Sequence, residues 1–388
     1  QGPLRARLAM CASRTSACCR CTQNCVPTMN PGHGQADMAT HLCLLGDATS
    51  PHVQRWAREM LQRGYRVSLI TARPASIDGV TVRAIRPVHR SLDWLLRVRE
   101  TRRHVAELAP DLLHAHYVTS YGYLAARCGK HPLVMTAWGS DLLVTPGKSA
   151  WMRWLTGWIL RQADLITGDS ASLMSAVADF RPPGAAEEIH WGVELQRFHP
   201  VPWSHKQGSQ LVSLRAWEPN YNIDTIIEAF ALLQARLPGA DLRLHLLGGG
   251  SLEGALRSQV HTAQLDNKVQ FHGRLDDAGM TQVLGESKIS VSVPSSDATS
   301  VAMLESMACG LAVVASELQA NRHWIDAQWL VAAGDATALA ARLEALIAND
   351  AIAEQAGLQN AARIAQDGDR AVQMNRMHAL YQQLLPTP

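Results

Sequence analysis

The residues best suited to chemistry lie between two predicted strands near residue 300. A β-branched strand ends at Pro294, and Thr299 or Ser300 can cap the helix that follows. The free N–H groups and the positive dipole end at such a helix start bind phosphate. Asp297 precedes this anion site and Glu305 lies inside the helix, and carboxylates accept paired hydrogen bonds from sugar hydroxyls. The segment therefore predicts a site for a nucleotide-linked sugar.

A second charged residue fits the same site. Arg215 follows the predicted strand 211–214, so it lies at the carboxyl edge of a parallel sheet, where α/β proteins bind ligands. A guanidinium there can hold a leaving diphosphate through two hydrogen bonds. Each feature also has an ordinary alternative: a helix start with solvated acids, and a surface salt bridge. Their occurrence in one chain favours the ligand site.

Length and charge limit the kinds of protein that this chain can be. A chain of 388 residues is too long for one ordinary core and predicts two domains. Residues 38–200 hold 19 Lys and Arg against 14 Asp and Glu, whereas residues 201–388 hold 13 against 19. A basic half beside an acidic half argues against nucleic-acid binding by the whole chain. An anionic partner is expected on the first half only.

The cysteines indicate a reducing compartment. Five of the eight lie within the first 25 residues, irregularly spaced among polar neighbours. This spacing argues against a zinc site, so residues 1–37 are predicted to be a disordered extension. Cys43, Cys128 and Cys309 lie in apolar settings, as free thiols do in a cytosolic protein. No apolar run is long enough to span a bilayer, and we expect a cytoplasmic protein.

The hydrophobic pattern alternates strands and helices along the chain after residue 38. Strands are expected at 41–45, 66–71, 80–85, 112–116, 133–137 and 165–167, and, after a linker near 198–208, at 211–214, 242–247, 269–271, 289–293 and 312–314. Helices are expected at 51–63, 92–108, 151–162, 223–237, 252–264 and 371–385. The pattern predicts an α/β fold with two Rossmann-like doubly wound domains facing across a cleft. We place these domains at 38–200 and 201–366, with a C-terminal helix, 367–388, packed back toward the first.

Three motifs resemble those of a known family. Asp297 and Glu305 have the spacing of a Glu-x7-Glu pair, residues 215–218 have the form Arg-x-x-Glu, and residues 191–200 read Trp-Gly-Val-Glu-x-x-x-Phe-x-Pro. Together they resemble the retaining GT-B glycosyltransferases of family 4, also called glycosyl transferases group 1. The resemblance implies metal-independent transfer of a sugar, with net retention, from a nucleotide-diphosphate sugar to an acceptor hydroxyl, without a cofactor.

The resemblance also implies roles on the donor side. Glu305 would hold the donor ribose, Asp297 would touch the donor sugar, and Arg215 would stabilise the diphosphate, which can then act as the base. Further donor contacts are implied at Thr299, Ser300, Val301, Gly248, Gly250, Arg274, Leu275 and Tyr221. The chain departs from the family three times here, because Asp297 replaces a Glu, residues 298–300 read Ala-Thr-Ser where Gly-Phe-Gly is usual, and residues 219–222 lack the expected Lys.

The resemblance is looser in the first half, on the acceptor side. Gly46 and His52 belong to a loop like the family's glycine loop, and His116 completes a His-x-His pair at a strand end. Trp138 replaces the His of the family's His-Gly-x-Asp motif; it cannot act as an acid or base, but it can stack on a sugar. Asp141 is expected to orient hydroxyls during catalysis. The His-x-His pair lacks further ligands, so no metal site is expected.

Two predicted helices carry residues suited to a membrane surface. One contains Arg97, Arg99, Arg102 and Arg103 among leucines, and in the other Trp151, Trp154 and Trp158 recur at i, i+3 and i+7. Basic helices with Trp anchors can lie on anionic membranes. The alternative is a solvated charged face and a Trp-lined core seam. Both interpretations stay open.

We therefore expect a cytoplasmic glycosyltransferase, peripheral at the inner face of the plasma membrane if the basic helices dock there. Its expected partners are a nucleotide sugar and a sugar, lipid-linked or polysaccharide acceptor in cell-envelope polysaccharide or glycolipid synthesis. One alternative is a sugar-nucleotide epimerase, which would need acid–base side chains that the sequence does not offer. The other is a non-catalytic binding protein of the same fold, which Trp138, Asp297 and the missing Lys would suit.

Overall fold

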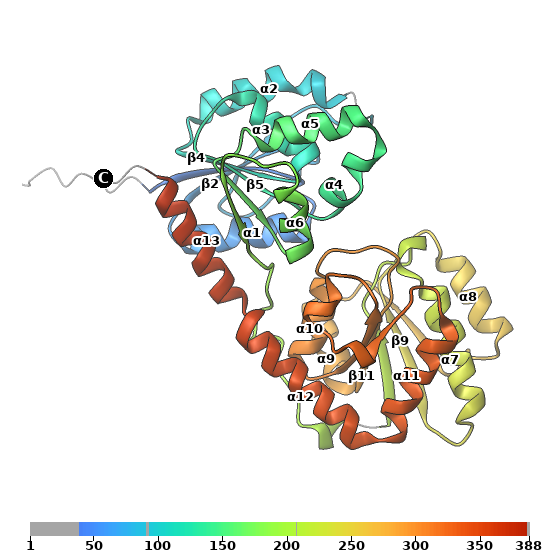
Figure 1. Cartoon of the computed structure of the whole chain (residues 1–388). Helices are drawn as coiled ribbons and strands as arrows, with labels where there is room; N and C mark the ends of the chain where they lie inside the picture. The colour runs from blue at the N-terminus through green and yellow to red at the C-terminus, as the bar shows by residue number, and fades with distance from the viewer. Residues whose placement is uncertain (1–38, 91–92, 207, 386–388) are drawn as a thin grey trace, which may run out of the picture. The chain divides into compact units, whose positions relative to one another are not determined.

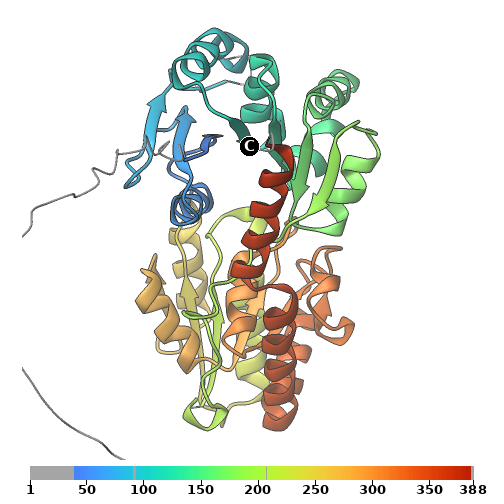
Figure 2. The ribbon, with the colours of Figure 1, turned by 90° about the vertical axis from the view of Figure 1, so that its left-hand side faces the viewer.

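The computed structural model describes residues 39–90, 93–206 and 208–385. The predicted disordered extension at residues 1–37 and the predicted helix start at Leu92 lie outside these ranges. The described residues form two parallel β-sheets, each with helices on both of its faces (Figures 1 and 2). The predicted α/β class and doubly wound architecture are confirmed.

The first sheet has the strand order β3-β2-β1-β4-β5-β6-β7. Its strands are β1 (His41–Leu45), β2 (Arg66–Thr71), β3 (Thr81–Ala84), β4 (Leu112–His116), β5 (Leu133–Thr136), β6 (Leu165–Gly168) and β7 (Ala185–Glu188). Its helices are α1 (Pro51–Gln62), α2 (Asp93–Leu108), α3 (Tyr123–Cys128), α4 (Ser140–Leu143), α5 (Ala150–Leu160) and α6 (Ala171–Ala178). The order reverses between β1 and β4, which creates a switch point at the carboxyl edge.

The second sheet repeats this winding, in the order β10-β9-β8-β11-β12-β13. Its strands are β8 (Ser209–Ser213), β9 (Leu242–Leu247), β10 (Val269–Gly273), β11 (Ile289–Ser292), β12 (Ala312–Ser316) and β13 (Leu330–Val331). The helices that follow β8 are α7 (Ile223–Arg236), α8 (Glu253–Thr262), α9 (Asp277–Glu286), α10 (Val301–Ala308), α11 (Ala336–Ala348), α12 (Asp350–Asp367) and α13 (Arg370–Leu384). The switch point lies between β8 and β11, the two strands that precede Arg215 and Asp297.

The buried strands explain why both sheets are parallel and covered on both faces. All residues of β1, β4 and β12 are buried, and these strands are almost continuously apolar. Strands buried on both faces need helical crossovers above and below the sheet. Edge strand β7 is not among the predicted strands, because its Ala-Ala-Glu-Glu sequence has low β-propensity. It is a strand through its pairing with β6.

The last helix, α13, packs on elements of the first sheet. Tyr381 is fully buried, and its hydroxyl accepts a hydrogen bond from Trp56 Nε1 at 3.1 Å. The same hydroxyl lies 2.5 Å from Nδ1 of His114 on β4. Burial holds the pKa of His114 well below its usual range, so the ring is neutral and its Nδ1 can accept a hydrogen bond from the tyrosine hydroxyl. The chain's final helix is thus tied to its first sheet by buried polar contacts.

No helix in the part of the chain that the structure describes combines the length and the apolar character needed to cross a bilayer.

Candidate active site

The loop between β11 and α10 is held in place by its own cap and by a neighbouring segment. Ser300 caps α10, because its hydroxyl accepts from the N–H of Met303 at 3.2 Å. Asn220 donates to the main-chain oxygen of Ser296 at 2.8 Å, and Asn222 donates to that of Val293 at 2.8 Å. The 219–222 segment, which lacks the family's Lys, therefore fixes the loop through neutral hydrogen bonds.

Arg215 and Asp297, both predicted site residues, form an ion pair. Arg215 Nη2 lies 2.5 Å from Asp297 Oδ2, and Nη1 donates to the hydroxyl of Ser300. The guanidinium also lies over the ring of Tyr221, 4.4 Å from its centroid. Burial raises the pKa of Asp297 above its usual range, and the charge of Arg215 opposes that rise. The pair places a fixed guanidinium beside the start of α10, where an arriving diphosphate would compete with Asp297.

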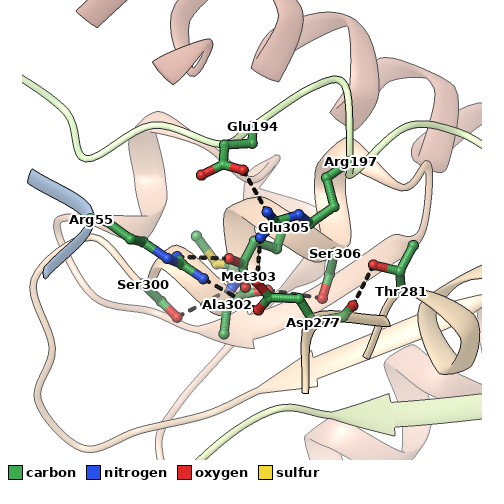
Figure 3. A network of polar contacts seen from close by, with 10 residues as sticks. All are labelled: Arg55, Glu194, Arg197, Asp277, Thr281, Ser300, Ala302, Met303, Glu305 and Ser306. Carbon is green, nitrogen blue, oxygen red and sulfur yellow. Dashed lines mark hydrogen bonds and ion pairs between the residues drawn. The ribbon is translucent and has the colours of Figure 1, made fainter. Parts of the chain in front are cut away.

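Glu305 lies inside α10 and is paired with Arg55, which is not among the predicted site residues. Glu305 is only 5% exposed, and its Oε1 lies 3.3 Å from Nη1 of Arg55 on α1 (Figure 3). Burial raises the pKa of Glu305 to about 7, although the charge of Arg55 opposes the rise. Arg55 also lies 3.8 Å from Asp277, which pairs with Arg197 (Figure 3). No local pattern marks Arg55, because its partner is 250 positions away.

Thr299 connects this loop to an element of the first sheet. Its hydroxyl does not cap α10 but donates to the main-chain oxygen of Asp169, just after β6, at 2.8 Å. His190 Nδ1 donates to the same oxygen at 2.8 Å. The two hydrogen bonds fix the backbone of Asp169 beside the loop that carries Asp297.

A cavity of about 500 Å³ brings most of the predicted residues together, and this volume is in the range of small-molecule sites. The predicted residues that line it are His52, Trp138, Arg215, Tyr221, Asp297, Thr299, Ser300, Val301 and Glu305. It is also lined by Arg55, Asp169 and Trp191, which were not predicted. Predicted residues that do not line it are Gly46, His116, Asp141, Gly248, Gly250, Arg274 and Leu275.

Gly248 and Gly250 are required by the packing of the protein itself. A Cβ atom on Gly248 would lie 2.2 Å from the main-chain oxygen of Arg215, and one on Gly250 would lie 2.3 Å from that of Trp217. Gly248 also has a φ of +152°, which side-chain-bearing residues rarely adopt. These glycines therefore let the loop after β9 pass close to Arg215; the role toward the nucleotide stays a prediction.

Asp141, a predicted catalytic residue, lies outside the cavity lining. It is fully buried, and its oxygens accept from the N–H groups of Val118 at 2.7 Å and of Trp138 and Gly139 at 3.0 Å each. Burial raises its pKa, and these N–H groups oppose the rise. Asp141 thus joins its own loop to the segment after β4 that contains Val118; the expected contact with hydroxyls stays a prediction.

The acceptor-side residues form an aromatic cluster. The ring of Trp138 meets those of His52 and Trp191 edge-on, with centroids 5.6 and 5.1 Å apart. Burial lowers the pKa of His52 to about 4 and that of His116 to about 3. Both rings are therefore neutral at neutral pH and can offer hydrogen bonds but no charge.

Solved structures resemble this fold over most of its length. Sucrose-phosphate synthase from Thermosynechococcus elongatus aligns with a TM-score of 0.74 at 18% identity, covering 89% of this chain and 99% of that one. Anabaena HepE, solved in complex with UDP and glucose, aligns with a TM-score of 0.72 at 15% identity, covering 88% of this chain and 99% of that one. Two doubly wound sheets with these neighbours define a GT-B protein.

Sequence comparison identifies the family. The model described as glycosyl transferase 4-like matches residues 41–170, and the model of glycosyl transferases group 1 matches residues 210–349. Together these ranges cover more than half of the chain, and the protein belongs to the group 1 glycosyltransferases, as its motifs predicted.

Two curated relatives are phosphatidyl-myo-inositol mannosyltransferases. The Mycolicibacterium smegmatis protein is 28% identical over 264 residues, which are 65% of this chain and 66% of the relative. The Mycobacterium leprae protein is 32% identical over 148 residues, or 36% and 37% of the two chains. The matches thus span less than two thirds of each relative's own length.

Proposed function

We propose that this protein transfers a sugar from a nucleotide-diphosphate sugar to an acceptor hydroxyl. The observation that carries the proposal is the cavity at the switch point of the second sheet, where Arg215, the start of α10 and Glu305 meet. A guanidinium and free N–H groups suit a diphosphate, and a buried carboxyl suits ribose hydroxyls. The family membership and a structural neighbour solved with UDP and glucose support the same ligand class.

The proposed reaction is retaining. The acceptor oxygen bonds to the anomeric carbon on the face from which the diphosphate oxygen departs, and the acceptor proton passes to that departing oxygen. Arg215 and the α10 N–H groups stabilise the charge that develops on the diphosphate. His52 and His116, whose pKa values burial lowers to about 4 and about 3, are weak bases, and Asp141 is fully buried and accepts three backbone N–H groups. We further propose that Arg215 supplies the positive charge that a metal would otherwise supply.

The test is turnover of UDP-, GDP- and ADP-sugars with acceptors supplied. Arg215→Ala is expected to lower kcat by about 100-fold or more, because it removes charge stabilisation at the leaving group. Arg236 pairs with Glu344 at the surface. The control variant Arg236→Ala should therefore leave kcat unchanged. NMR of the product gives the anomeric configuration, and activity should persist in EDTA. Binding without turnover would favour the non-catalytic alternative, and interconversion of the donor sugar would favour an epimerase.

We also infer that the protein binds peripherally to an anionic membrane surface. Helix α5 would make this contact to a greater extent than helix α2. Trp151 and Trp154 are 57% and 61% exposed, and residues 142–163 contain three basic and no acidic residues. On α2, by contrast, Arg97 and Arg102 donate to main-chain oxygens of their own surroundings. Trp residues and cations together suit the interface of an anionic bilayer.

Sedimentation with vesicles tests this membrane surface. The protein should sediment with phosphatidylglycerol vesicles more than with phosphatidylcholine vesicles. Replacing both Trp151 and Trp154 by Ser should release it, whereas neutralising Arg102 and Arg103 should have a smaller effect. Equal sedimentation of the Trp variant and the wild type would rule the surface out.

A further inference from the structure

The wall of the cavity contains a carboxyl oxygen without a hydrogen-bond partner. Asp169 follows β6, lines the cavity and is 2% exposed. Its main-chain oxygen is fully used by Thr299 and His190, but its side-chain atom Oδ1 has no hydrogen-bond partner. An unsatisfied buried polar atom costs about 1–3 kcal/mol, and proteins keep such groups mainly where they serve a function.

A donor without a partner lies in the same wall. Trp138 lines the cavity, and its buried Nε1 also lacks a hydrogen-bond partner. Two cations of the cavity are engaged: Arg215 with Asp297 and Ser300, and Arg55 with Glu305. Asp169 and Trp138, which lie on segments of the first sheet, thus present one carboxyl oxygen and one N–H donor to whatever fills the cavity, beside the neutral ring of His52.

The charges around Asp169 indicate which kind of group it can meet. Burial raises the pKa of Asp169 well above its usual range, and the negative charges of Asp297 and Asp141 raise it further. The backbone N–H groups of Asp169 and Thr299 oppose the rise. A neutral carboxyl both donates and accepts hydrogen bonds, as a hydroxyl does. Arg215 and the α10 start, which suit phosphate, belong to the second sheet, and Arg55, the cation on the first-sheet side of the cavity, is paired with Glu305. An uncharged polyhydroxyl group is the natural partner of the first-sheet wall.

We propose that Asp169, together with the indole N–H of Trp138, binds hydroxyls of the donor's sugar ring and so selects which sugar is transferred. This inference rests on the proposed function and deepens it. Asp169 would act on the sugar alone, whereas Arg215 and Glu305 would act on the nucleotide part. One set of residues would thus bind the sugar and another set the nucleotide. The two contributions can therefore be measured separately, with a free nucleotide and with its nucleotide sugar.

Calorimetric titration with matched ligand pairs tests the assignment. The pairs are UDP with UDP-glucose, UDP with UDP-N-acetylglucosamine, GDP with GDP-mannose, and ADP with ADP-glucose. For the pair that wild type binds, Asp169→Ala should lower the affinity for the nucleotide sugar about tenfold. The affinity for the free nucleotide should change less than about twofold. Trp138→Phe keeps the ring but removes the N–H, and should show the same selective loss. Asp169→Asn, which still donates and accepts, should restore most of the affinity.

The outcomes separate this inference from the proposed function. If Asp169→Ala lost affinity equally for the nucleotide and for the nucleotide sugar, the role of Asp169 would be structural only. Unchanged affinities in Asp169→Ala would overturn the inference and leave the proposed function standing. If wild type binds none of the nucleotides or nucleotide sugars, the proposed function and the inference both fall. Thermal unfolding of each variant shows that the fold is intact, and the Asn variant should unfold no earlier than wild type.

Discussion

Glu305 links the candidate site to the pH dependence of stability. Its folded-state pKa is about 7, above the usual 4.5, because burial disfavours its charge. The folded protein therefore binds a proton more tightly than the unfolded chain, and stability is lost as pH rises from about 4.5 to 7. Glu305→Gln removes this slope and should stabilise the ligand-free protein at pH 8 by up to about 3 kcal/mol. Urea unfolding at pH 5 and pH 8 measures the difference.

An exposed carboxylate provides the control for this prediction. Glu317 pairs with Arg322 at the surface, and its side chain is 52% exposed. Glu317→Gln should leave the pH dependence as it is in wild type. A Glu305→Gln variant with the wild-type slope would show that this carboxyl is already ionised at pH 5 in the folded protein.

At the scale of secondary-structure elements, the loop after β9 and the segment after β8 must pass close to each other. Gly248→Ala would bring a Cβ within 2.2 Å of a main-chain oxygen at a φ of +152°. We expect a loss of about 2 kcal/mol or more, because backbone and not a flexible side chain must move. The displaced segment carries Arg215, so activity should fall with stability. Thermal unfolding and turnover measure the two effects.

A second glycine gives the opposite expectation. Gly254 lies in α8, and a Cβ there would meet nothing within 4 Å. Gly254→Ala should therefore stabilise the protein by about 0.5–1 kcal/mol through helix propensity. If both substitutions changed the stability in the same direction, the close approach of the backbone would not explain why position 248 needs a glycine.

At the scale of the whole molecule, Tyr381 joins the last helix to the first sheet. Tyr381→Phe would leave Trp56 Nε1 and His114 Nδ1 buried without their partner. The expected cost is about 1–3 kcal/mol, the cost of unsatisfied buried polar groups. Calorimetry should show a lower unfolding temperature. Val372→Ala, on the exposed face of the same helix, should change it little. An unchanged transition in Tyr381→Phe would mean that water replaces the hydroxyl.

Much of the fold could be predicted because its information is local. Buried strands such as Leu112–His116 are short apolar runs, and helices such as Pro51–Gln62 have apolar residues at helical spacing. The residues nearest the α10 start were also recognisable, because Asp297, Ser300 and Glu305 lie within one short segment. Asp169 also carries a usable signal, since it is an acid just beyond the predicted strand 165–167.

Contacts between distant segments could not be predicted in the same way. Nothing near Arg55 in the chain shows that it pairs with Glu305, and nothing near Thr299 shows that it bonds to Asp169. Burial likewise depends on the assembled core: it makes Asp141 a loop-holding residue and keeps His52 and His116 neutral. Residue types and spacing were enough to indicate the class of ligand, because helix starts and carboxylates have fixed chemistry. Which side chains meet that ligand, and in which protonation state, was decided by packing, because desolvation and pairing arise only when remote segments come together.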